Sequence, residues 1–515
     1  MKFNSALLAG FTAGSTVAAQ KVVPLGVRRS NDQPLSVHKR ATFAQNLNNN
    51  ITGAAYYANV AIGTPPQNVS LILDTGSSDV WVVSRDADLC QDASDQQYYG
   101  FCLATYEPSD SSSYKMVDQS FSIRYADRTR AVGDYFKDDF HVAGTTIKQL
   151  QMGLGINTTI PSGIMGIGFA SNVASETPYP NIMDVFLSDG LIGSKAYSLY
   201  LNDYDSSTGT ILFGGIDTEK YIGKLGALNI QEDATSGSIT SFTVALSSFK
   251  MNVNGSTVYQ ESDPLPVILD SGTTLSYLPS ELVSRIYQTL DAYDDTMGVM
   301  ASGSVYVDCK YLGQNISLDF QFGGSDGPVI NVPVDEVIFN NVARLQDLGL
   351  ALPADLPFDN VCTLGVMASE GIYLLGDTFL RSAYVVYDLS NQQIALAQAN
   401  LNSTKSNIIE ITNSSTTIPD ATGVASQVTV TQTATGLPGV GGGSGTTSGG
   451  PSGTASGSNV PTTTTTGSST GTESGATSST ANAGPRNVPA PKWEALAVAG
   501  LAGLGVLTGG MILAI

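Results

Sequence analysis

Histidine is scarce in this sequence, and the scarcity limits the chemistry available to the protein. Only two histidines occur among the 515 residues, His38 and His141. A Ser-His-Asp or Cys-His hydrolase would have to use His141, yet no nucleophile-elbow sequence accompanies it. We expect His141 to be a surface or strand residue, so any hydrolytic chemistry here must depend on carboxylates.

Positively charged residues are also few. The chain has 24 Lys and Arg against 45 Asp and Glu, which gives a formal net charge of −21 at pH 7. Nucleic acid is excluded as a partner, because so acidic a chain has little with which to neutralise phosphate. We interpret the acidity as a source of solubility or of tolerance to acid surroundings. Attraction of basic substrates is the alternative interpretation.

Only four cysteines occur, and no two of them have CxxC spacing. This spacing argues against a zinc or redox site, and nothing else in the sequence suggests a metal, a nucleotide or an organic cofactor. Behind an export signal, an even number of cysteines predicts disulfides. The four cysteines, which allow three pairings that spacing alone does not separate, are Cys90, Cys102, Cys309 and Cys362.

The N-terminal part of the chain has the pattern of an exported precursor. A basic start, a short apolar run and a group of small residues predict a signal peptide over residues 1–19. Residues 20–40 contain two dibasic pairs, Arg28-Arg29 and Lys39-Arg40, of the kind that processing proteases cut in the secretory route. We therefore predict a propeptide that is released before Ala41; a basic disordered arm is the alternative.

The next segment, residues 41–400, has the pattern of a mostly β domain. Short apolar stretches broken by Gly, Pro, Asn and Asp predict strands, for example at residues 56–62 and 69–73. One helix is predicted after Pro279, where apolar residues recur at helical spacing up to Leu290. The domain should therefore consist of many strands and a few short helices.

Towards the C-terminus the composition changes to Ser, Thr and Gly without apolar periodicity. Such a segment buries too little surface to fold, so residues 401–482 are predicted to form a disordered, O-glycosylated stalk. An uncharged stretch at residues 495–515 follows small residues and a spacer, which is the pattern of a glycosylphosphatidylinositol (GPI) attachment signal. We predict attachment at Asn482 and removal of residues 483–515. Attachment within residues 474–476 and a retained membrane helix are the alternatives.

Seven N-x-Ser/Thr sequons lie in the chain. In an exported protein several of them should carry glycans, which would place those residues on the surface. The sequons are at Asn50, Asn68, Asn157, Asn254, Asn315, Asn402 and Asn413.

Two short segments of the sequence are alike. Each leads from an apolar strand into Asp, a hydroxyl residue, Gly and two more hydroxyl residues, as LILDTGSS at residues 71–78 and VILDSGTT at residues 267–274. Each is followed by an apolar-apolar-Gly echo, at residues 164–166 and 374–376. Two motifs repeated in the same order imply two lobes of similar topology that face each other.

The repeat places an aspartate, Asp74 or Asp270, at the end of each predicted strand. If the two carboxyl groups meet about 3 Å apart, both cannot ionise, and the pair holds one proton. The ionised member can take a proton from water while the protonated member donates to a substrate carbonyl, which hydrolyses an amide without a covalent intermediate. Gly76 and Gly272 allow tight turns beneath the carboxylates. Hydroxyl groups available to orient the pair belong to Thr75, Ser77, Ser271 and Thr273.

With these motifs the sequence resembles the pepsin-like aspartic proteases over nearly all of residues 53–400. The matching segments are DTGSSDVW at 74–81, DSGTT at 270–274 and YLLGDTFLRSAYVVYD at 373–388. Within that family it is most similar to the yapsin-type endopeptidases of fungi, through ILFGGIDTEKYIGKL at 211–225 and through the stalk and anchor. The resemblance implies an all-β, bilobal fold with pseudo-twofold related lobes at about 53–225 and 226–400.

The same resemblance implies roles for further residues. Tyr125 matches the flap tyrosine that closes over substrate, and Trp81 matches the tryptophan that hydrogen-bonds to it. Other positions that match substrate-binding residues are Gly76, Gly272 and Thr274. The family pairs neighbouring cysteines, which here implies Cys90–Cys102 and Cys309–Cys362.

The flap departs from the family pattern, because Ala126-Asp127-Arg128 follows the tyrosine where glycines are usual. Arg128 would then stand at a position suited to positive φ, which is uncommon for residues other than glycine. We interpret Arg124, Arg128 and Arg130 as solvated charges on a hairpin. Selection of acidic side chains, or repulsion of basic ones, is the alternative.

Together these features predict an aspartic endopeptidase, monomeric, that cleaves proteins or peptides in acid surroundings. We expect it at the extracellular face of the plasma membrane through its GPI lipid, or in the cell wall. A binding-only descendant of the fold is disfavoured because both aspartates and their hydroxyl neighbours are intact. A structural wall glycoprotein is disfavoured because a stalk does not account for the paired motifs.

Overall fold

The coordinates come from a computed structural model of the whole chain. The residues that the structure describes are 21–29, 55–99, 101–102, 104–127, 129–204, 206, 208–234, 236–297, 302–347 and 352–431. The predicted signal peptide, the GPI signal and residues 432–482 of the predicted stalk lie outside these ranges. Within them, no helix is both long enough and apolar enough to cross a membrane.

Strands dominate the described residues and form four sheets, as the sequence predicted. The strands of the largest sheet, in spatial order, are β28 (Ala421–Gly423), β12 (Tyr221–Asn229), β26 (Gln393–Ala399), β25 (Ala383–Asp388), β9 (Ala196–Tyr200), β10 (Thr208–Phe213), β1 (Val23–Arg29), β2 (Tyr56–Ile62), β3 (Gln67–Asp74), β8 (Ile164–Gly166), β4 (Val80–Val83), β7 (Thr145–Thr158), β6 (Arg130–Val142) and β5 (Lys115–Arg124). Those of the second sheet are β20 (Val329–Pro333), β19 (Ile316–Phe322), β13 (Thr243–Val253), β15 (Leu265–Leu269), β24 (Leu374–Leu375), β16 (Ser276–Pro279) and β23 (Val366–Ser369), with β14 (Ser256–Glu261) beside β13. The small sheets contain β17 (Tyr293–Asp295), β18 (Ser304–Asp308), β22 (Val361–Leu364) and β21 (Ile338–Phe339), and β11 (Gly215–Asp217) with β27 (Ile408–Glu410).

The helices of the described residues are short. They are α1 (Asp88–Gln91), α2 (Ala93–Tyr99), α3 (Ile182–Ser188), α4 (Ser280–Thr289), α5 (Val342–Asp347) and α6 (Asp377–Leu380). The predicted helix is confirmed as α4, which begins directly after Pro279 and buries Leu282, Val283 and Ile286 on one side. Pro279 marks the start because proline has no amide hydrogen to donate and fits before the first turn.

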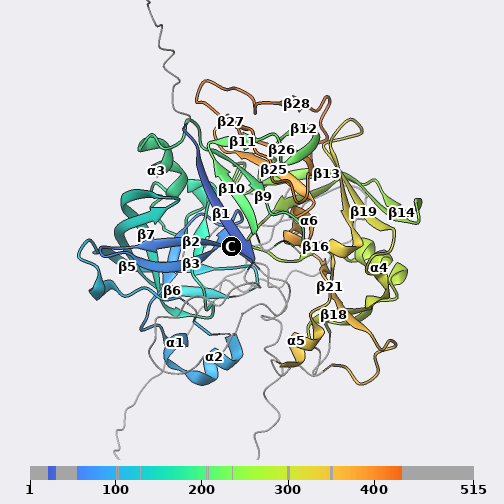
Figure 1. Ribbon diagram of the computed structural model, residues 1–515, viewed down its shortest axis with the longest axis horizontal. Coiled ribbons are helices and arrows are strands. Elements are labelled where there is room, and N and C mark those ends of the chain that lie inside the picture. The colour runs from blue at the N-terminus through green and yellow to red at the C-terminus, as the bar shows by residue number, and fades with distance from the viewer. Residues whose placement is uncertain are drawn as a thin grey trace, which may run out of the picture. The chain divides into compact units, whose positions relative to one another are not determined.

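The two sequence repeats fold into the same arrangement of strands. In the first lobe, β3 pairs in parallel with β8, which pairs antiparallel with β4, which pairs in parallel with β7. In the second lobe, β15, β24, β16 and β23 repeat those pairings in the same order and directions. In Figure 1 the strands β5–β7 and the elements β14, β19 and α4 lie on opposite sides of β9, β10 and β25. The fold is therefore bilobal, and each repeat occupies the centre of its lobe.

The first described strand is a central member of the large sheet. β1 lies between β10 and β2, antiparallel to both, and pairs residues 23–28 with β10 and residues 27–29 with β2. The side chains of its residues Val23, Leu25 and Val27 are buried. This strand lies within residues 20–40, which the sequence analysis places in the propeptide.

The boundary predicted for the stalk is wrong by about thirty residues, since residues 401–431 pack on the body of the protein. β27 pairs with β11, and β28 runs parallel to β12 at the edge of the large sheet. Ile411 and Ile418 from this segment are fully buried. Composition suggested disorder because most of the segment is polar, but two apolar anchors and backbone pairing with sheet edges are enough to order it.

Candidate active site

Two aspartates stand at equivalent places in the two lobes. Asp74 is the last residue of β3, and Asp270 follows the last residue of β15. The echo segments explain why both loops turn there, because β8 and β24 pair in parallel with the strands that lead into the aspartates. Both aspartate side chains are completely buried.

Each carboxylate accepts the same pair of hydrogen bonds from its own loop. The amide of Gly76 donates to Asp74 Oδ1 at 2.7 Å, and the hydroxyl of Ser77 donates to Oδ2. In the second lobe the amide of Gly272 donates to Asp270 Oδ1 at 2.8 Å, and Thr273 Oγ1 donates to Oδ2 at 2.6 Å. Because both glycine amides are used in this way, any contact of Gly76 or Gly272 with a substrate main chain must use the carbonyl oxygens.

The residues next to the aspartates tie the lobes together. Thr75 Oγ1 donates to the carbonyl oxygen of Leu269 at 2.9 Å and accepts from the amide of Ser271 at 2.9 Å. Ser271 Oγ donates to the carbonyl oxygen of Leu73 at 2.8 Å and accepts from the amide of Thr75 at 3.2 Å. These four buried bonds fix one aspartate loop against the other.

The two carboxyl groups lie within hydrogen-bonding reach of each other. Burial raises the pKa of Asp74 well above its usual range, and the charge of Asp270 raises it further. Burial also raises the pKa of Asp270, to about 6, against hydrogen bonds from Thr273 and Gly272 that lower it. Both raised pKa values mean that the pair keeps a proton to a higher pH than an ordinary carboxyl group does, and so holds one through the acid range.

Tyr125 lies at the end of the hairpin formed by β5 and β6. Its ring is fully buried, and its hydroxyl accepts a hydrogen bond of 2.8 Å from Trp81 Nε1. Burial and the charge of Asp74 raise the pKa of Tyr125 well above its usual range, so its phenol stays protonated. The structure therefore brings together the tyrosine and the tryptophan that the sequence paired by resemblance.

The tip of the hairpin closes without glycine. The amide of Tyr125 donates to the carbonyl oxygen of Thr129 at 2.9 Å, and Asp127 accepts from the amide and the hydroxyl of Thr129 at 2.8 and 2.7 Å. Ala126 packs against Ile268 of the second lobe and its neighbours. Arg128, for which we predicted a positive φ, lies outside the described residues. Arg124 and Arg130 face each other across the hairpin and are exposed, which favours solvated charges.

The model of the family described as eukaryotic aspartyl protease matches residues 55–399. The chain belongs to this family. The Aspergillus fumigatus protein named "Probable aspartic-type endopeptidase opsB" is 40% identical over 426 residues, which are 80% of this chain and 81% of that protein.

Two further relatives extend the comparison to other fungi. Secreted aspartic protease 4 of Candida albicans is 36% identical over 380 residues, covering 73% of this chain and 83% of that protein. An acid protease of Saccharomycopsis fibuligera is 34% identical over 355 residues, covering 67% of this chain and 80% of that protein. The chain is therefore a pepsin-like aspartic endopeptidase of the fungal type.

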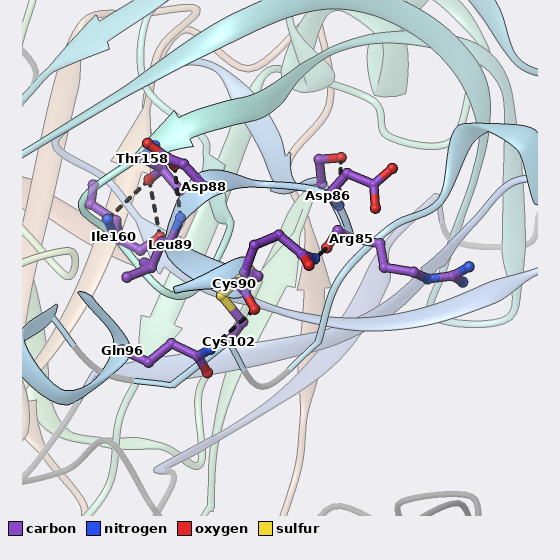
Figure 2. Close-up of a disulfide and its surroundings, with 11 residues drawn as sticks. Arg85, Asp86, Asp88, Leu89, Cys90, Gln96, Cys102, Thr158 and Ile160 are labelled. Atoms are coloured by element: carbon purple, nitrogen blue, oxygen red, sulfur yellow. Dashed lines mark hydrogen bonds between the residues drawn. A yellow bond between two sulfur atoms is a disulfide. The ribbon is translucent and has the colours of Figure 1, made fainter. Parts of the chain in front are cut away.

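Both disulfides of this aspartyl protease join neighbouring cysteines, Cys90–Cys102 and Cys309–Cys362. Figure 2 shows the first of them, which joins Cys90 of α1 to Cys102; in the same helix Asp88 Oδ1 accepts from the amide of Thr158 at 3.0 Å. Thr158 is the last residue of β7 and pairs with β6 close to the flap. The disulfide loop is thus attached beside the tip of the hairpin that carries Tyr125.

Two further residues singled out in the sequence, Thr274 and His141, make ordinary structural hydrogen bonds. Thr274 is buried, and its carbonyl oxygen accepts from the amide of Thr378 in α6 at 3.1 Å. His141 lies on β6 and bonds to Thr146 Oγ1 and to the carbonyl oxygen of Gly63, as a strand residue would. Among the described residues, no group of three or more His, Cys, Asp or Glu could hold a metal ion.

The sequons within the described residues all lie on exposed side chains, namely Asn68, Asn157, Asn254, Asn315, Asn402 and Asn413. Asn50 lies outside the described residues, as does the predicted attachment site Asn482. The side-chain amide of Asn157 contacts Asp88, the residue that anchors the disulfide loop. Glycosylation and the lipid anchor remain predictions.

Sequence reasoning missed one buried carboxylate near the flap. Asp79, in the same DTGSSDVW segment as Asp74, accepts hydrogen bonds from Tyr135, Tyr179 and the amide of Ala174. One signal could have found it, because the second repeat has Leu275 at the equivalent position. Because the second repeat has a leucine there, the shared fold does not require a carboxylate at this position.

Proposed function

We propose that Asp74 and Asp270 are the catalytic dyad of this endopeptidase and that they activate water for attack on a peptide bond. The observation that carries the proposal is the burial of two carboxyl groups, within hydrogen-bonding reach, on loops with the same hydrogen-bond pattern. Like charges so close cannot both persist away from water, so the dyad holds one proton.

The two carboxyl groups of the pair, one ionised and one protonated, have different roles in the reaction. The ionised carboxylate takes a proton from water as the oxygen attacks the peptide carbonyl carbon. The protonated carboxyl donates its hydrogen to the carbonyl oxygen, and the tetrahedral intermediate then collapses as the amine leaves with a proton. The flap tyrosine, Tyr125, supports the proposal because its hydroxyl accepts from Trp81 and keeps its own hydrogen available to a substrate. Neutral Ser77 and Thr273 hydroxyls hold the carboxyl groups in place.

The raised pKa values support activity in acid. A dyad that gained both charges as the pH rises would lose its proton donor, so rates should fall towards neutral pH. Residues 1–19 have the pattern of a signal peptide, so the enzyme would be exported. Export is compatible with a preference for acid surroundings. The relative from Candida albicans is named as a secreted aspartic protease, which supports secretion of this chain as well.

Placement at the cell surface is a further part of the proposal. The GPI signal, with attachment at Asn482, would leave the enzyme on the outer face of the plasma membrane or allow its transfer to the wall. Release of the enzyme from intact cells by a phosphatidylinositol-specific phospholipase is the expected result. Detection of peptides from residues 495–515 in the mature protein would contradict it.

Maturation by dibasic cleavage completes the proposal. Cleavage after Lys39-Arg40 would give a mature chain that begins at Ala41, and N-terminal sequencing of the secreted protein tests this. A single start at Gln20 would contradict it. Substrates would then be proteins or peptides outside the cell, cleaved by a monomer without a cofactor.

The dyad is tested by replacing each aspartate with its amide. Asp74→Asn and Asp270→Asn keep the shape of the site but remove the shared proton, so kcat/KM should fall by more than about a thousandfold. The measurement is cleavage of denatured protein and of an oligopeptide between about pH 3 and pH 6. Cleavage by Asp74→Asn at the wild-type rate would refute the mechanism.

A further inference from the structure

Asp79 is a buried carboxylate that lies immediately before β4, five residues after Asp74. Three neutral donors surround it. The hydroxyl groups of Tyr179 and Tyr135 lie 2.5 and 3.2 Å from Oδ1, and the amide of Ala174 lies 2.7 Å from Oδ2. Within the described part of the chain, no Lys, Arg or His forms an ion pair with it. A buried charge that only neutral groups compensate is costly to keep.

The second lobe shows that the repeated motif does not itself need this carboxylate. The equivalent residue, five positions after Asp270, is Leu275, which is 4% exposed. One main-chain contact of this residue is shared by the two lobes, because in each a glycine packs against its carbonyl oxygen. A Cβ added at Gly166 would lie 2.7 Å from the oxygen of Asp79, and one at Gly376 would lie 2.4 Å from that of Leu275. The carboxylate is therefore a feature of the lobe that carries the flap.

The tyrosine donors belong to the aromatic cluster that holds the flap tyrosine. Tyr135 lies on β6, the strand that returns from the flap tip, and its ring packs edge-on against Tyr179 at 5.6 Å and Phe121 at 5.3 Å between centroids. Phe121 lies 6.1 Å from the ring of Trp81, whose indole donates to Tyr125. Asp79 is thus connected to the flap tyrosine through a hydrogen bond to Tyr135, the packed rings of Tyr135, Phe121 and Trp81, and the hydrogen bond from Trp81 to Tyr125.

We propose that Asp79 is a positioning residue for the flap tyrosine. Its bonds to two tyrosine hydroxyls and one amide join its own loop to two other segments of the first lobe, β6 and residues 174–179, and the packed rings of the cluster hold Trp81 in one orientation. Trp81 in turn sets the position of the Tyr125 hydroxyl. The inference rests on the proposed function, and it extends that function from the dyad to the packing that aims the flap. Such positioning affects the rate because a small displacement of a group that contacts the transition state is costly.

The backbone contact with Ala174 extends the same control to a second segment. Ala174 lies between η2 (Ala170–Asn172) and α3, in the stretch that also carries Tyr179. The carboxylate therefore holds this stretch at two points, one through the main chain and one through a side chain. Loss of the carboxylate should therefore free both residues 174–179 and the aromatic cluster around Tyr125 to move.

A double-mutant cycle in the full-length protein tests the proposal. The variants are Asp79→Leu, which copies the second lobe, Tyr125→Phe, and the two combined. We expect Asp79→Leu to lower kcat/KM by about tenfold or more, mostly through kcat. Tyr125→Phe should lower kcat/KM in the wild type but add less than about twofold in the Asp79→Leu background, because the phenol is already misplaced. Additive losses would overturn the proposal, and so would an Asp79→Leu enzyme as active as the wild type.

Asp388→Asn provides a matched control for the loss of a buried carboxylate. Asp388 is fully buried on β25 and accepts from the amide and side chain of Asn391, far from the flap in the sheet order. This change should lower the Tm, yet its loss of activity, whatever its size, should add to that of Tyr125→Phe. Coupling of the same size between Asp388→Asn and Tyr125→Phe would mean that the cycle reports general destabilisation, and it would overturn the proposal.

A milder variant keeps the test decisive if Asp79→Leu fails to fold. Tyr179→Phe removes only the 2.5 Å hydrogen bond and keeps the ring. It should lower kcat/KM about threefold to tenfold and couple with Tyr125→Phe in the same way.

Asp74→Asn separates this test from that of the proposed function. If Asp74→Asn is inactive while Asp79→Leu and Tyr179→Phe behave like the wild type, only the positioning role is refuted. If Asp74→Asn is fully active, the dyad itself is refuted.

Discussion

Gly76 occupies a place where a side chain would strike the partner carboxyl group. A Cβ built at this residue would lie 2.6 to 2.9 Å from the two oxygens and the carboxyl carbon of Asp270. Gly76→Ala must therefore displace one carboxyl group from the other, and kcat/KM should fall by about a hundredfold or more. Steady-state kinetics measure this loss, and thermal unfolding should show a much smaller effect because the loop is otherwise held by four bonds between lobes.

Gly423→Ala is the matched control for that substitution. Nothing lies within 4 Å of a Cβ added at Gly423, which is the last residue of β28. The control should retain full activity. Equal activity of Gly76→Ala and the wild type would show that the carboxyl groups need not stay in contact.

The two aspartates could be predicted from the sequence because a repeat is visible within a single chain. The flap pair could be predicted only by resemblance, since nothing local indicates that Trp81 and Tyr125 meet. Asp79 was missed for a physical reason: its tyrosine donors stand 56 and 100 residues away in the sequence. Alternation along a strand shows that a residue is buried, but it does not show which side chain from another strand it faces.

At the scale of elements, β1 raises a question about the predicted maturation. The strand pairs on both sides and buries Val23, Leu25 and Val27, although cleavage after Arg40 would separate it from the rest of the chain. Its loss would expose the edges of β10 and β2 to solvent. We therefore predict that the cleaved N-terminal peptide stays bound to the mature enzyme.

Mass spectrometry of the mature enzyme tests this prediction. Under native conditions the mass should include the peptide, and under denaturing conditions the peptide should separate from the chain that begins at Ala41. Val27→Asp, which puts a charge at a buried position, should weaken the association. A native mass without the peptide, in a protein that retains activity, would contradict the prediction.

The segment at residues 401–431 gives a second prediction at this scale. Ile411 is fully buried and Ile418 is 1% exposed, so both anchor a segment that is otherwise polar. Each replacement by Ala should lower the free energy of unfolding by about 2 to 4 kcal/mol through lost burial and a residual cavity. Urea unfolding measures the change, and Ile222→Ala, at a site 59% exposed, should have little effect. Losses as small as that of the control would show that the segment is not part of the cooperative fold.

Those two isoleucines also show where composition fails as a guide. Disorder was predicted because Ser, Thr and Gly dominate beyond residue 400 and apolar residues show no periodicity. The segment needs no core of its own, since the edges of β11 and β12 offer it unpaired backbone groups. Asp217 adds side-chain anchors by accepting from Ser406 Oγ and from the amide of Asn407, each at 2.7 Å. Sequence patterns indicate regular elements well, but they do not indicate which exposed edge a polar segment can complete.

At the scale of the whole molecule, the protein should lose stability as the pH rises. Burial raises the pKa of Asp270 from an ordinary value of 3.8 to about 6, and it raises the pKa of Asp74, Asp79 and Asp388 as well. A carboxyl group with a raised folded-state pKa contributes stability that is fully present below its unfolded pKa and is lost as the pH rises through the folded pKa. The loss should therefore develop between about pH 4 and pH 7.

Thermal unfolding across that pH range, at fixed ionic strength, tests the prediction and its cause. The Tm should fall by several degrees towards pH 7, and Asp270→Asn should reduce the fall because the amide has no proton to lose. Repulsion from a net charge of −21 also destabilises the fold as the carboxyl groups ionise. Salt separates the two causes, since it screens surface charges strongly and buried ones weakly. A fall in Tm that persists at about 1 M salt but shrinks in Asp270→Asn would assign it to the dyad, whereas a fall that disappears in salt would assign it to surface charge.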